Sequence, residues 1–311
     1  LEQMKISGFT FSRNGSRLYY PIIESIVSII DLVDEFVVAL GQGDVDDTTE
    51  SQIKALNNPK IKIIKTVWDL EKYSDGTIYA HQTNLAKDAC KGDWLFYLQG
   101  DEVVHEKYLD KIKTACEQQY ERSEVEGILF GYKHFWGDYK HYHSSRCWYP
   151  FETRIIRNRS DIYSWGDAQT FRRIPDFDGF SYRKRKDTFR LHVVKSDAEI
   201  YHYGWVRPIN LILKKQRYTN QYYSNHGDQA VSFDYGPLGR LSLFNDTHPS
   251  VMKNWISKFD WADELNYTKY YTAKQPIHRH DYLRNRIITQ IELFLFGEKT
   301  FGRKNYELLR K

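Results

Sequence analysis

Two adjacent acids, Asp101 and Glu102, follow directly on the apolar and aromatic run 94–98 (WLFYL). Such a run is typical of a buried strand, which would deliver both carboxylates into the crevice beyond the end of a sheet. A carboxylate held out of water is costly unless a cation or a hydrogen-bond donor meets it. Oxygen ligands of this kind suit Mg²⁺ or Mn²⁺, and such an ion can neutralise a diphosphate leaving group. The alternative is that the two acids cap a helix that begins near His105.

Two further polar loops follow apolar strands in the same way, at residues 12–16 and 41–49. The second loop contains GQGDVDD, which lacks the third glycine of a dinucleotide-binding fingerprint and carries acids that would repel a pyrophosphate. We therefore exclude NAD binding of the Rossmann type. Asp44, Asp46 and Asp47 are better suited to accept hydrogen bonds from a base or a ribose, although a solvated acidic turn explains any one of them equally well.

The elements that must position these loops alternate between strand and helix. Apolar runs predict the strands, and apolar residues at helical spacing, such as Ile22, Ile26 and Ile30 behind Pro21, predict the helices. This order implies right-handed crossovers and a mostly parallel sheet covered on both faces. The expected strands are 5–10, 35–40, 60–65 and 94–98, and the expected helices begin at Pro21 or span 50–57, 77–90 and 105–120.

The pattern changes after about Gly127. GILFGY and ETRIIRN read as strands, but aromatic, histidine-rich and basic loops separate them instead of helices. From Pro208 the chain is expected to be helical again, in PINLILKKQRYTNQYY, HPSVMKNWISKF and HDYLRNRIITQIELFLF. The apolar residues of the last of these segments are dense enough to predict that it packs on the preceding domain as core.

The composition limits the class of protein. The chain has 311 residues, of which 41% are hydrophobic and 28% charged, so a disordered chain and a membrane-embedded one are both excluded. A net charge of +4 does not indicate a nucleic-acid partner. Cys90, Cys116 and Cys147 show no CxxC spacing, which favours a reducing, cytoplasmic compartment over a disulfide framework. The 8 Trp, 24 Tyr and 17 Phe suit either a groove for sugars or bases or an ordinary core.

Three stretches together resemble family 2 glycosyltransferases of the GT-A fold, especially bacterial ones: KISGFTFSRNGS, EFVVALGQGDVDDTTE and HQTNLAKDACKGDWLFYLQGDEVVHE. The resemblance covers residues 5 to about 205. It implies an α/β fold with a mostly parallel nucleotide-binding sheet flanked by helices, followed by a helical C-terminal appendage. We accordingly expect a catalytic domain over 1–206, with a nucleotide-binding half (1–126) and an acceptor half (127–206), and a helical region over 207–311.

The resemblance also implies roles for single residues. The nucleotide base and ribose would lie beside Phe9, Thr10, Arg13, Asp44 and Asp46, with Asn84 near the acidic motif. Asp101 falls on the last acid of the DxD motif, whereas Gln99 stands in place of its first acid, which leaves open how strongly the motif needs a metal. His202 in HYGW would complete the metal or diphosphate site, and Arg207 would contact a phosphate. The basic run Lys184, Arg185 and Lys186 is either a further phosphate contact or a solvated loop.

The acceptor side needs a base. An inverting transfer requires a carboxylate that deprotonates the acceptor hydroxyl, and Asp167, at the apparent start of a helix in SWGDAQTF, is the first candidate, with Glu152 second. Trp148, Tyr149 and Trp165 would stack on the acceptor sugar. A zinc site made of His134, His141, His143 and Cys147 matches no standard spacing, so we interpret these residues as lining the acceptor groove.

Together these features predict a hexosyltransferase-like enzyme with a Mn²⁺ or Mg²⁺ cofactor. It would move a sugar from a nucleotide diphosphate donor, UDP- or GDP-linked, to a hydroxyl of a glycan or lipid-linked acceptor. We expect a cytoplasmic protein that contacts the inner face of the membrane at most peripherally. The alternatives are a non-catalytic carbohydrate- or nucleotide-binding protein, and a nucleotidyltransferase, which would normally show a more glycine-rich basic loop than SRNGSR.

Overall fold

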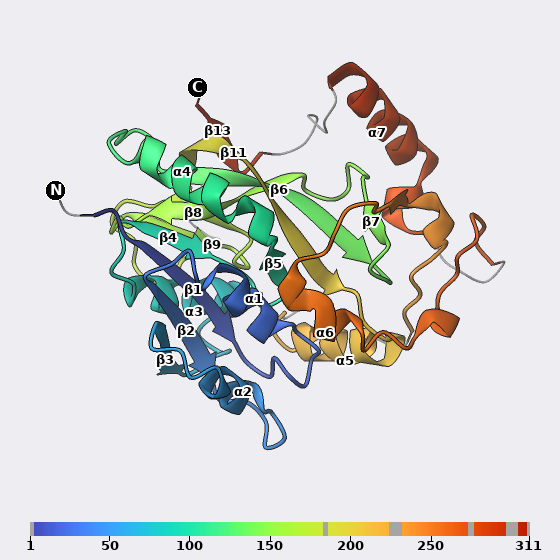
Figure 1. The fold of residues 1–311 in the computed structure, drawn as a ribbon, viewed down its shortest axis with the longest axis horizontal. Coiled ribbons are helices and arrows are strands. Elements are labelled where there is room, and N and C mark those ends of the chain that lie inside the picture. Colours follow the sequence, from blue (N-terminus) through green and yellow to red (C-terminus); the bar gives the residue numbers. More distant parts are fainter. Residues whose placement is uncertain (1–2, 183–185, 224–231, 273–276, 297–303, 310–311) are drawn as a thin grey trace.

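The computed structural model describes residues 3–182, 186–223, 232–272, 277–296 and 304–309. Its centre is a mixed sheet with the strand order β3-β2-β1-β4-β8-β6-β11-β10-β9 (Figure 1). The four strands of the N-terminal half are parallel: β1 (Ile6–Ser12), β2 (Glu35–Gly41), β3 (Ile61–Thr66) and β4 (Trp94–Tyr97). The helices between and after them are α1 (Ile22–Ile29), α2 (Thr49–Ala55), α3 (Thr77–Asp88) and α4 (Leu109–Gln119). The predicted alternation of strand and helix is confirmed.

Both faces of this parallel sheet are buried. In β2, the side chains of Phe36, Val38 and Leu40 belong to a core that also contains residues of α1 and α4, whereas Val37 and Ala39 belong to a second core with residues of α3. This division follows from the pleat, since successive side chains of a strand point to opposite faces. Figure 1 shows α1 and α4 in front of the sheet and α3 behind it. Continuous apolar strands are therefore required here.

The sheet changes from parallel to antiparallel beyond β4. The strand β8 (Phe151–Arg157) runs antiparallel to β4 and to β6 (Gly127–Trp136), and the 17-residue strand β11 (Phe189–Trp205) pairs with β6 in parallel. The short strands β5 (Glu102–Val104), β7 (His141–His143), β9 (Ile162–Trp165) and β10 (Thr170–Arg173) extend these ladders. His202 lies inside this long strand, since β5 and β6 both pair with β11 at this residue.

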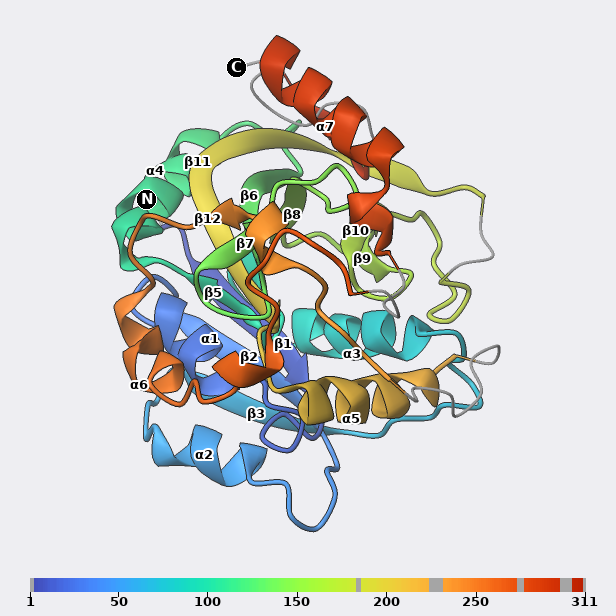
Figure 2. The same ribbon diagram turned by 90° about the vertical axis from the view of Figure 1, so that its right-hand side faces the viewer.

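The region after Pro208 is only partly helical. In the view of Figure 2 the helix α5 (Ile209–Asn220) lies below α3, and the ring of Tyr222, just past the end of α5, lies 5.4 Å from that of Tyr79 in α3 between centroids. The segment HPSVMKNWISKF forms only a 3₁₀ turn and the single-turn helix α6 (Lys253–Ile256). Tyr235, Leu238, Met252 and Trp261 belong to the same core as the sheet. The remaining elements are β12 (Ser242–Leu243), α7 (Leu283–Phe296), β13 (Tyr306–Leu308) and the 3₁₀ turns Glu106–Tyr108, Leu238–Arg240, Ser250–Met252, Ala262–Glu264 and Arg279–Asp281.

The helix α7 attaches through its polar side. Its buried residues are Thr289 and Glu292, whereas the exposed fractions of Ile287, Ile291 and Phe294 are 50%, 46% and 88%. The prediction that the apolar residues of this segment are core is therefore wrong, because the helix is turned so that they face away from the domain. The calculated hydropathy of the helices in the described residues rules out each of them as a membrane-spanning segment.

Candidate active site

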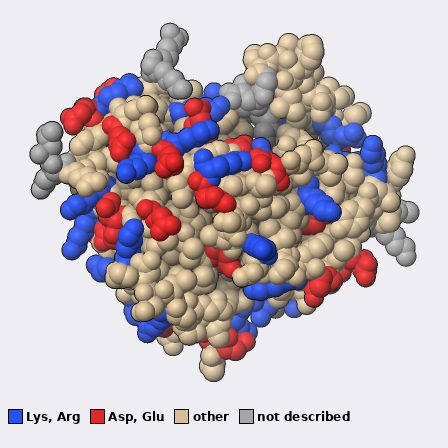
Figure 3. All heavy atoms as spheres, in the orientation of Figure 1, with Lys and Arg blue, Asp and Glu red and all other residues tan. Residues whose placement is uncertain are grey.

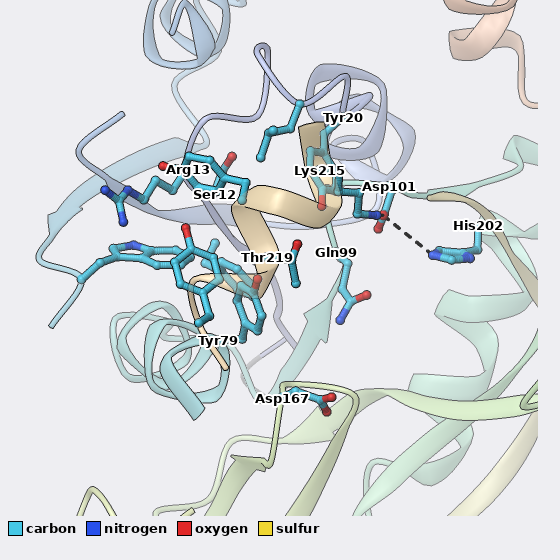
Figure 4. A pocket seen from close by; sticks show the side chains of 16 residues that line it. Ser12, Arg13, Tyr20, Tyr79, Gln99, Asp101, Asp167, His202, Lys215 and Thr219 are labelled. Atoms are coloured by element: carbon cyan, nitrogen blue, oxygen red, sulfur yellow. Dashed lines mark ion pairs between the residues drawn. The ribbon is translucent and has the colours of Figure 1, made fainter. Parts of the chain in front are cut away.

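A pocket of about 250 Å³ opens where β1 and β4 end and α5 passes over them (Figure 4). In an open α/β sheet, the loops after neighbouring strands meet at the carboxyl ends of the strands, and ligands bind in the crevice between these loops. Its lining residues come from the end of β1 and the loops after β1, β3 and β4, from α3, from the β9–β10 turn, from β11, and from α5 and the residues just after it. They are Phe11, Ser12, Arg13, Leu18, Tyr20, Trp68, Tyr79, Gln99, Gly100, Asp101, Asp167, His202, Lys215, Tyr218, Thr219 and Tyr222.

One side of the pocket is a wall of aromatic rings. Trp68 lies 5.9 Å from Tyr79 and 5.6 Å from Tyr222 between ring centroids, and Phe11 stacks on Tyr79 at 5.7 Å. The guanidinium of Arg13 lies 5.5 Å from the centre of the Trp68 ring. Aromatic faces and an arginine plane are the groups on which a flat heterocycle stacks. The wall can therefore hold a nucleobase.

The polar end of the pocket is built around Asp101. This carboxylate is buried, and its Oδ2 lies 3.5 Å from the ammonium of Lys215 and 3.8 Å from Nε2 of His202. Burial by itself would raise the pKa of Asp101 and is the largest single influence, but Lys215, His202, Arg207 and a backbone hydrogen bond together outweigh it, so the pKa lies below its usual value. Burial lowers the pKa of Lys215 to about 8. At neutral pH this end of the pocket therefore holds an ionised acid beside a cation.

A chain of hydrogen bonds fixes the ring of His202. The carbonyl of Tyr149 can only accept, so Nε2 of His134, 2.8 Å away, must donate to it. A neutral His134 carries only this one N–H, so its Nδ1 accepts across 3.1 Å from Nδ1 of His202, whose pKa is lowered by burial. This leaves an unprotonated Nε2 on His202 that faces the carboxylate of Asp101. Two acceptors that face each other fit a cation between them.

Asp101 and His202 therefore fit one divalent cation, which would take its remaining ligands from a bound diphosphate. Within the described part of the chain, no group of three or more His, Cys, Asp or Glu side chains is placed to hold a metal. The alternative zinc site is not assembled there: Nδ1 of His141 pairs with Asp138, and Cys147 is exposed. The protein would thus supply only two ligands.

The neighbouring acid Glu102 belongs to the core. Both of its carboxylate oxygens accept from the guanidinium of Arg154, at 2.9 Å and 2.8 Å, and Tyr132 donates to it at 2.8 Å. Glu102 and Arg154 are both fully buried. The alternative that the two acids cap the following helix is wrong, because His105 caps it instead, its Nδ1 accepting from the amide of Lys107.

Five of the residues singled out from the sequence line the pocket: Arg13, Gln99, Asp101, Asp167 and His202. Asp167 sits in a tight turn between β9 and β10, with Gly166 and Ala168 at positive φ, and not at the start of a helix as the sequence suggested. The reason is that residues 162–165 and 170–173 pair with each other as antiparallel strands. In Figure 4, Asp167 lies below Gln99, across the pocket from Lys215.

Three other predicted residues lie in the interior, outside the pocket. Phe9 and Thr10 are fully buried inside β1, since the pocket begins only at Phe11 near the end of that strand. Asn84 accepts from the amide of Ser164 at 2.8 Å and so ties α3 to β9. These contacts give the residues structural partners away from the ligand space.

The acids after β2 are paired on the surface. Arg17 forms ion pairs with Asp44 and with Asp46, the latter at 2.7 Å, and Asp44 lines a separate hollow with Asp47.

Glu152 is buried, and Gln169 and Asn305 each donate to its Oε1 at 3.0 Å. Burial raises the pKa of Glu152. These four acids, Glu152 and the three after β2, lie outside the pocket lining.

The predicted phosphate ligand Arg207 is fully buried behind the pocket. Its Nη1 donates to the carbonyl of Leu18 at 2.5 Å, and its guanidinium packs 4.8 Å from the centre of the Tyr20 ring. Arg207 therefore adds positive charge near the site without lining it. Lys184 and Arg185 lie outside the described residues, and Lys186 is exposed.

The sequence analysis missed Lys215 and much of the aromatic wall. Lys215, Tyr218, Thr219 and Tyr222 are spaced by three or four residues, so they share one face of α5 and its end. That spacing is visible in the sequence. What the sequence does not show is that this face closes over the ends of β1 and β4, because α5 docks there only through tertiary contacts.

No protein-family model matches the sequence, and no curated protein matches it significantly. Among solved structures, the chain is similar to S. aureus TarS in complex with UDP, at 17% identity and a TM-score of 0.30 over 42% of this chain and 36% of that chain. For S. aureus TarS 1–349 without a ligand in its name, the identity is 15% and the TM-score 0.37, over 69% of this chain and 64% of that chain. For glucosyl-3-phosphoglycerate synthase from Mycobacterium tuberculosis, in complex with Mn²⁺, UDP and phosphoglyceric acid, the identity is 17% and the TM-score 0.28, over 42% of this chain and 43% of that chain. The match spans less than two thirds of each of these chains, and similarity at this level carries no functional argument.

Proposed function

We propose that the protein is a glycosyltransferase of the GT-A type, in the manner of family 2, that uses a nucleoside diphosphate sugar as its donor. The observation that carries this proposal is the joining of an aromatic wall and a charged Asp101–His202–Lys215 cluster in one pocket at the ends of parallel strands. A base stacked on Trp68 and Tyr79 would direct its diphosphate toward that cluster. Such a division into a stacking end and a charged end suits a nucleoside diphosphate, UDP or GDP.

Asp101 and His202 would hold Mn²⁺ or Mg²⁺, which when bound neutralises negative charge on the diphosphate. The hydrogen-bond chain through His134 keeps the ligating nitrogen of His202 unprotonated. Asp167 lies on the opposite side of the pocket, where it would take the proton of the acceptor hydroxyl. Attack from the side opposite the leaving diphosphate gives inversion at the sugar. We place the acceptor, a glycan or lipid-linked hydroxyl, beside Asp167, and the reaction in the cytoplasm.

Ligand-dependent thermal stabilisation tests the donor. UDP, GDP, CDP and dTDP are compared with Mn²⁺ present, and a nucleotide at a hundred times its dissociation constant should stabilise the protein by about 2.7 kcal/mol. Trp68→Ala should abolish the stabilisation. Tyr270→Ala, at a tyrosine that is 76% exposed, is the matched aromatic control and should leave it unchanged.

Hydrolysis of the donor then separates the remaining candidates. A glycosyltransferase should slowly release nucleoside diphosphate from the matching nucleotide sugar without an acceptor. Nucleotide binding with no release would favour a non-catalytic binding protein, and release of pyrophosphate from a nucleoside triphosphate would favour a nucleotidyltransferase. Failure of all four nucleotides to bind would contradict the proposal.

A further inference from the structure

The charges around Asp101 are unusual for a site that depends on a metal alone. Where the DxD pattern would place its first acid, Gln99 is neutral, and its amide donates to the carbonyl of Ala168 at 3.3 Å. Two basic side chains, Lys215 and Arg207, lie near the single carboxylate of Asp101, and both lower its pKa. This end of the pocket is therefore positive before any metal is added. A positive, partly desolvated site attracts a polyanion.

Lys215 is the cation of this pair that reaches the ligand space. Its ammonium lies 3.5 Å from Oδ2 of Asp101 and 3.2 Å from the carbonyl of Gly204, and it lies 4.9 Å from the centre of the Tyr20 ring. The side chain is 20% exposed and lines the pocket. An ammonium has three donors, and the contacts to Asp101 and to the Gly204 carbonyl leave one for a ligand on the pocket side. Figure 4 shows the side chain running from α5 to Asp101.

We propose that Lys215 binds the diphosphate of the donor directly, so that nucleoside diphosphate binds to this pocket without a divalent cation. This inference rests on the proposed glycosyltransferase function and names a residue that contacts the diphosphate where Gln99 stands in place of the first acid of the DxD motif. In the transfer, the bond between the anomeric carbon and the β-phosphate oxygen breaks, and a bond from the acceptor oxygen to that carbon forms. The acceptor proton goes to Asp167, and the extra negative charge of the departing diphosphate is stabilised by the Lys215 ammonium.

Calorimetric titration of the full chain with UDP and GDP in excess EDTA tests the inference. The wild type should bind the matching nucleotide, and Lys215→Met, which keeps the length of the side chain and removes its charge, should weaken binding by about tenfold to a hundredfold. Lys215→Arg should retain most of it. Lys214→Met is the matched control, since Lys214 is the next residue of α5 but does not line the pocket. Circular dichroism melting shows that each variant is folded.

The inference is overturned if the wild type binds nucleotide only after Mn²⁺ is added, or if Lys215→Met binds as tightly as the wild type in EDTA. Inorganic pyrophosphate, which lacks a base, separates this result from the donor assignment. If neither nucleotide binds but pyrophosphate binds and is weakened by Lys215→Met, the proposed function fails and the anion site stands. If pyrophosphate binding is insensitive to Lys215→Met in that case, the anion site fails as well.

A second inference rests on the helix α7. The α7 face, which we define as Leu283, Ile287, Ile291, Phe294 and Leu295, falls within about a third of the circumference of the helix. Each of these side chains is at least 46% exposed, whereas Thr289 and Glu292 point to the protein. In Figure 3 the lobe at the upper right, where α7 lies in Figure 1, is mostly free of charged side chains.

The exposed charged side chains around the α7 face are positive. Among residues 277–296 the exposed charged side chains are Arg279, Arg284 and Arg286. The acids of this segment are withdrawn: Asp281 accepts from the hydroxyl of Tyr271 at 2.7 Å, and Glu292 lies 3.6 Å from Arg146. A hollow of about 480 Å³ against the helix is lined by Arg240 and Arg286 and by the half-buried Asp281. An apolar helix face that carries Arg284 in its first turn, with Arg279 and Arg286 beside it, matches an anionic bilayer surface, whereas pairing with a second copy would bring these arginines together.

We infer that the α7 face rests on a membrane that contains anionic lipid. Cosedimentation with vesicles of phosphatidylcholine and phosphatidylglycerol tests this, against vesicles of phosphatidylcholine alone. The wild type should bind only the anionic vesicles, and both Ile287→Ser/Phe294→Ser and Arg284→Gln/Arg286→Gln should lose binding. Val45→Ser, at a fully exposed valine of the acidic loop, is the control and should bind normally. Absence of binding by the wild type overturns the inference, as does a dimer in solution that the serine variant abolishes.

Discussion

The pocket and the helix α7 differ in which side chains they bury: the pocket buries charged groups, whereas α7 buries polar residues and exposes its apolar ones. Around the pocket, charged groups are drawn inward and matched: Asp101 faces Lys215, and Glu102 just behind it is bound by Arg154. At α7, polar groups anchor the helix, and its apolar side chains face solvent. Buried, matched charges hold side chains in one geometry, whereas exposed apolar side chains add little to stability. The first arrangement prepares a binding site, and the second leaves a surface open for contact.

The largest effect should come from breaking the buried pair behind the pocket. Glu102→Ala leaves the guanidinium of Arg154 buried without its partner, so we expect the free energy of unfolding to fall by about 3–5 kcal/mol. Asp101→Ala, one residue earlier, should instead abolish metal-dependent nucleotide binding. Urea unfolding and calorimetry measure the two quantities. Equal loss of stability in both variants would show that the two acids do not divide into a structural and a binding role.

The next effect is on pH dependence at the base of α7. Burial lowers the pKa of His280 to about 4, against about 6.5 in an unfolded chain. The folded state therefore binds fewer protons than the unfolded state below about pH 6.5, and stability is lost as the pH falls toward 4. We expect this loss to be on the order of 3 kcal/mol, and His280→Gln should remove it. Urea midpoints at neutral pH and near pH 4.5 measure it. An equal loss in the variant would assign the effect to other groups.

Asp167 tests the acceptor side of the pocket. Asp167→Asn keeps the shape of the side chain and removes the base, so the catalytic rate should fall about 10²-fold while donor affinity stays constant. Steady-state kinetics with the matching nucleotide sugar separates the two. Glu152→Gln is the comparison, because Glu152 lies outside the pocket lining and should affect stability more than rate. The reverse pattern would make Glu152 the base.

The smallest effect should be at the α7 face. Phe294→Ser removes a side chain that is 88% exposed, so the free energy of unfolding should change by less than about 0.5 kcal/mol. Ile26→Ala in α1 is the matched loss of apolar volume at a fully buried position and should cost about 2–5 kcal/mol. Thermal and urea unfolding of both variants check this contrast. A loss at Phe294 comparable to that at Ile26 would mean that α7 packs its apolar side on the protein.

Much of the N-terminal half follows from the sequence because its signals are local. Apolar runs of strand length and the stripe of isoleucines in α1 are set by pleat and helical period, so the alternation of elements and the place of the polar loops could be predicted. The same reasoning predicted that the loops after β1 and β4 meet, and Arg13, Gln99 and Asp101 from these loops line one pocket. Asp167 was placed near a sugar by resemblance but on the wrong element, since a hairpin depends on pairing between strands.

The sequence by itself determined which residues end the strands, and therefore where polar side chains gather. Only the tertiary structure decided which of them meet. Asp101 and Glu102 are adjacent in the chain, yet one faces the pocket and the other the core, because the backbone turns its side chains to opposite sides and Arg154 is buried on one of them. Lys215 reaches Asp101 because α5 docks over the strand ends, and α7 turns its apolar side outward because its polar side is the one that finds partners. Contacts between elements depend on packing of the whole chain, which local periodicity does not encode.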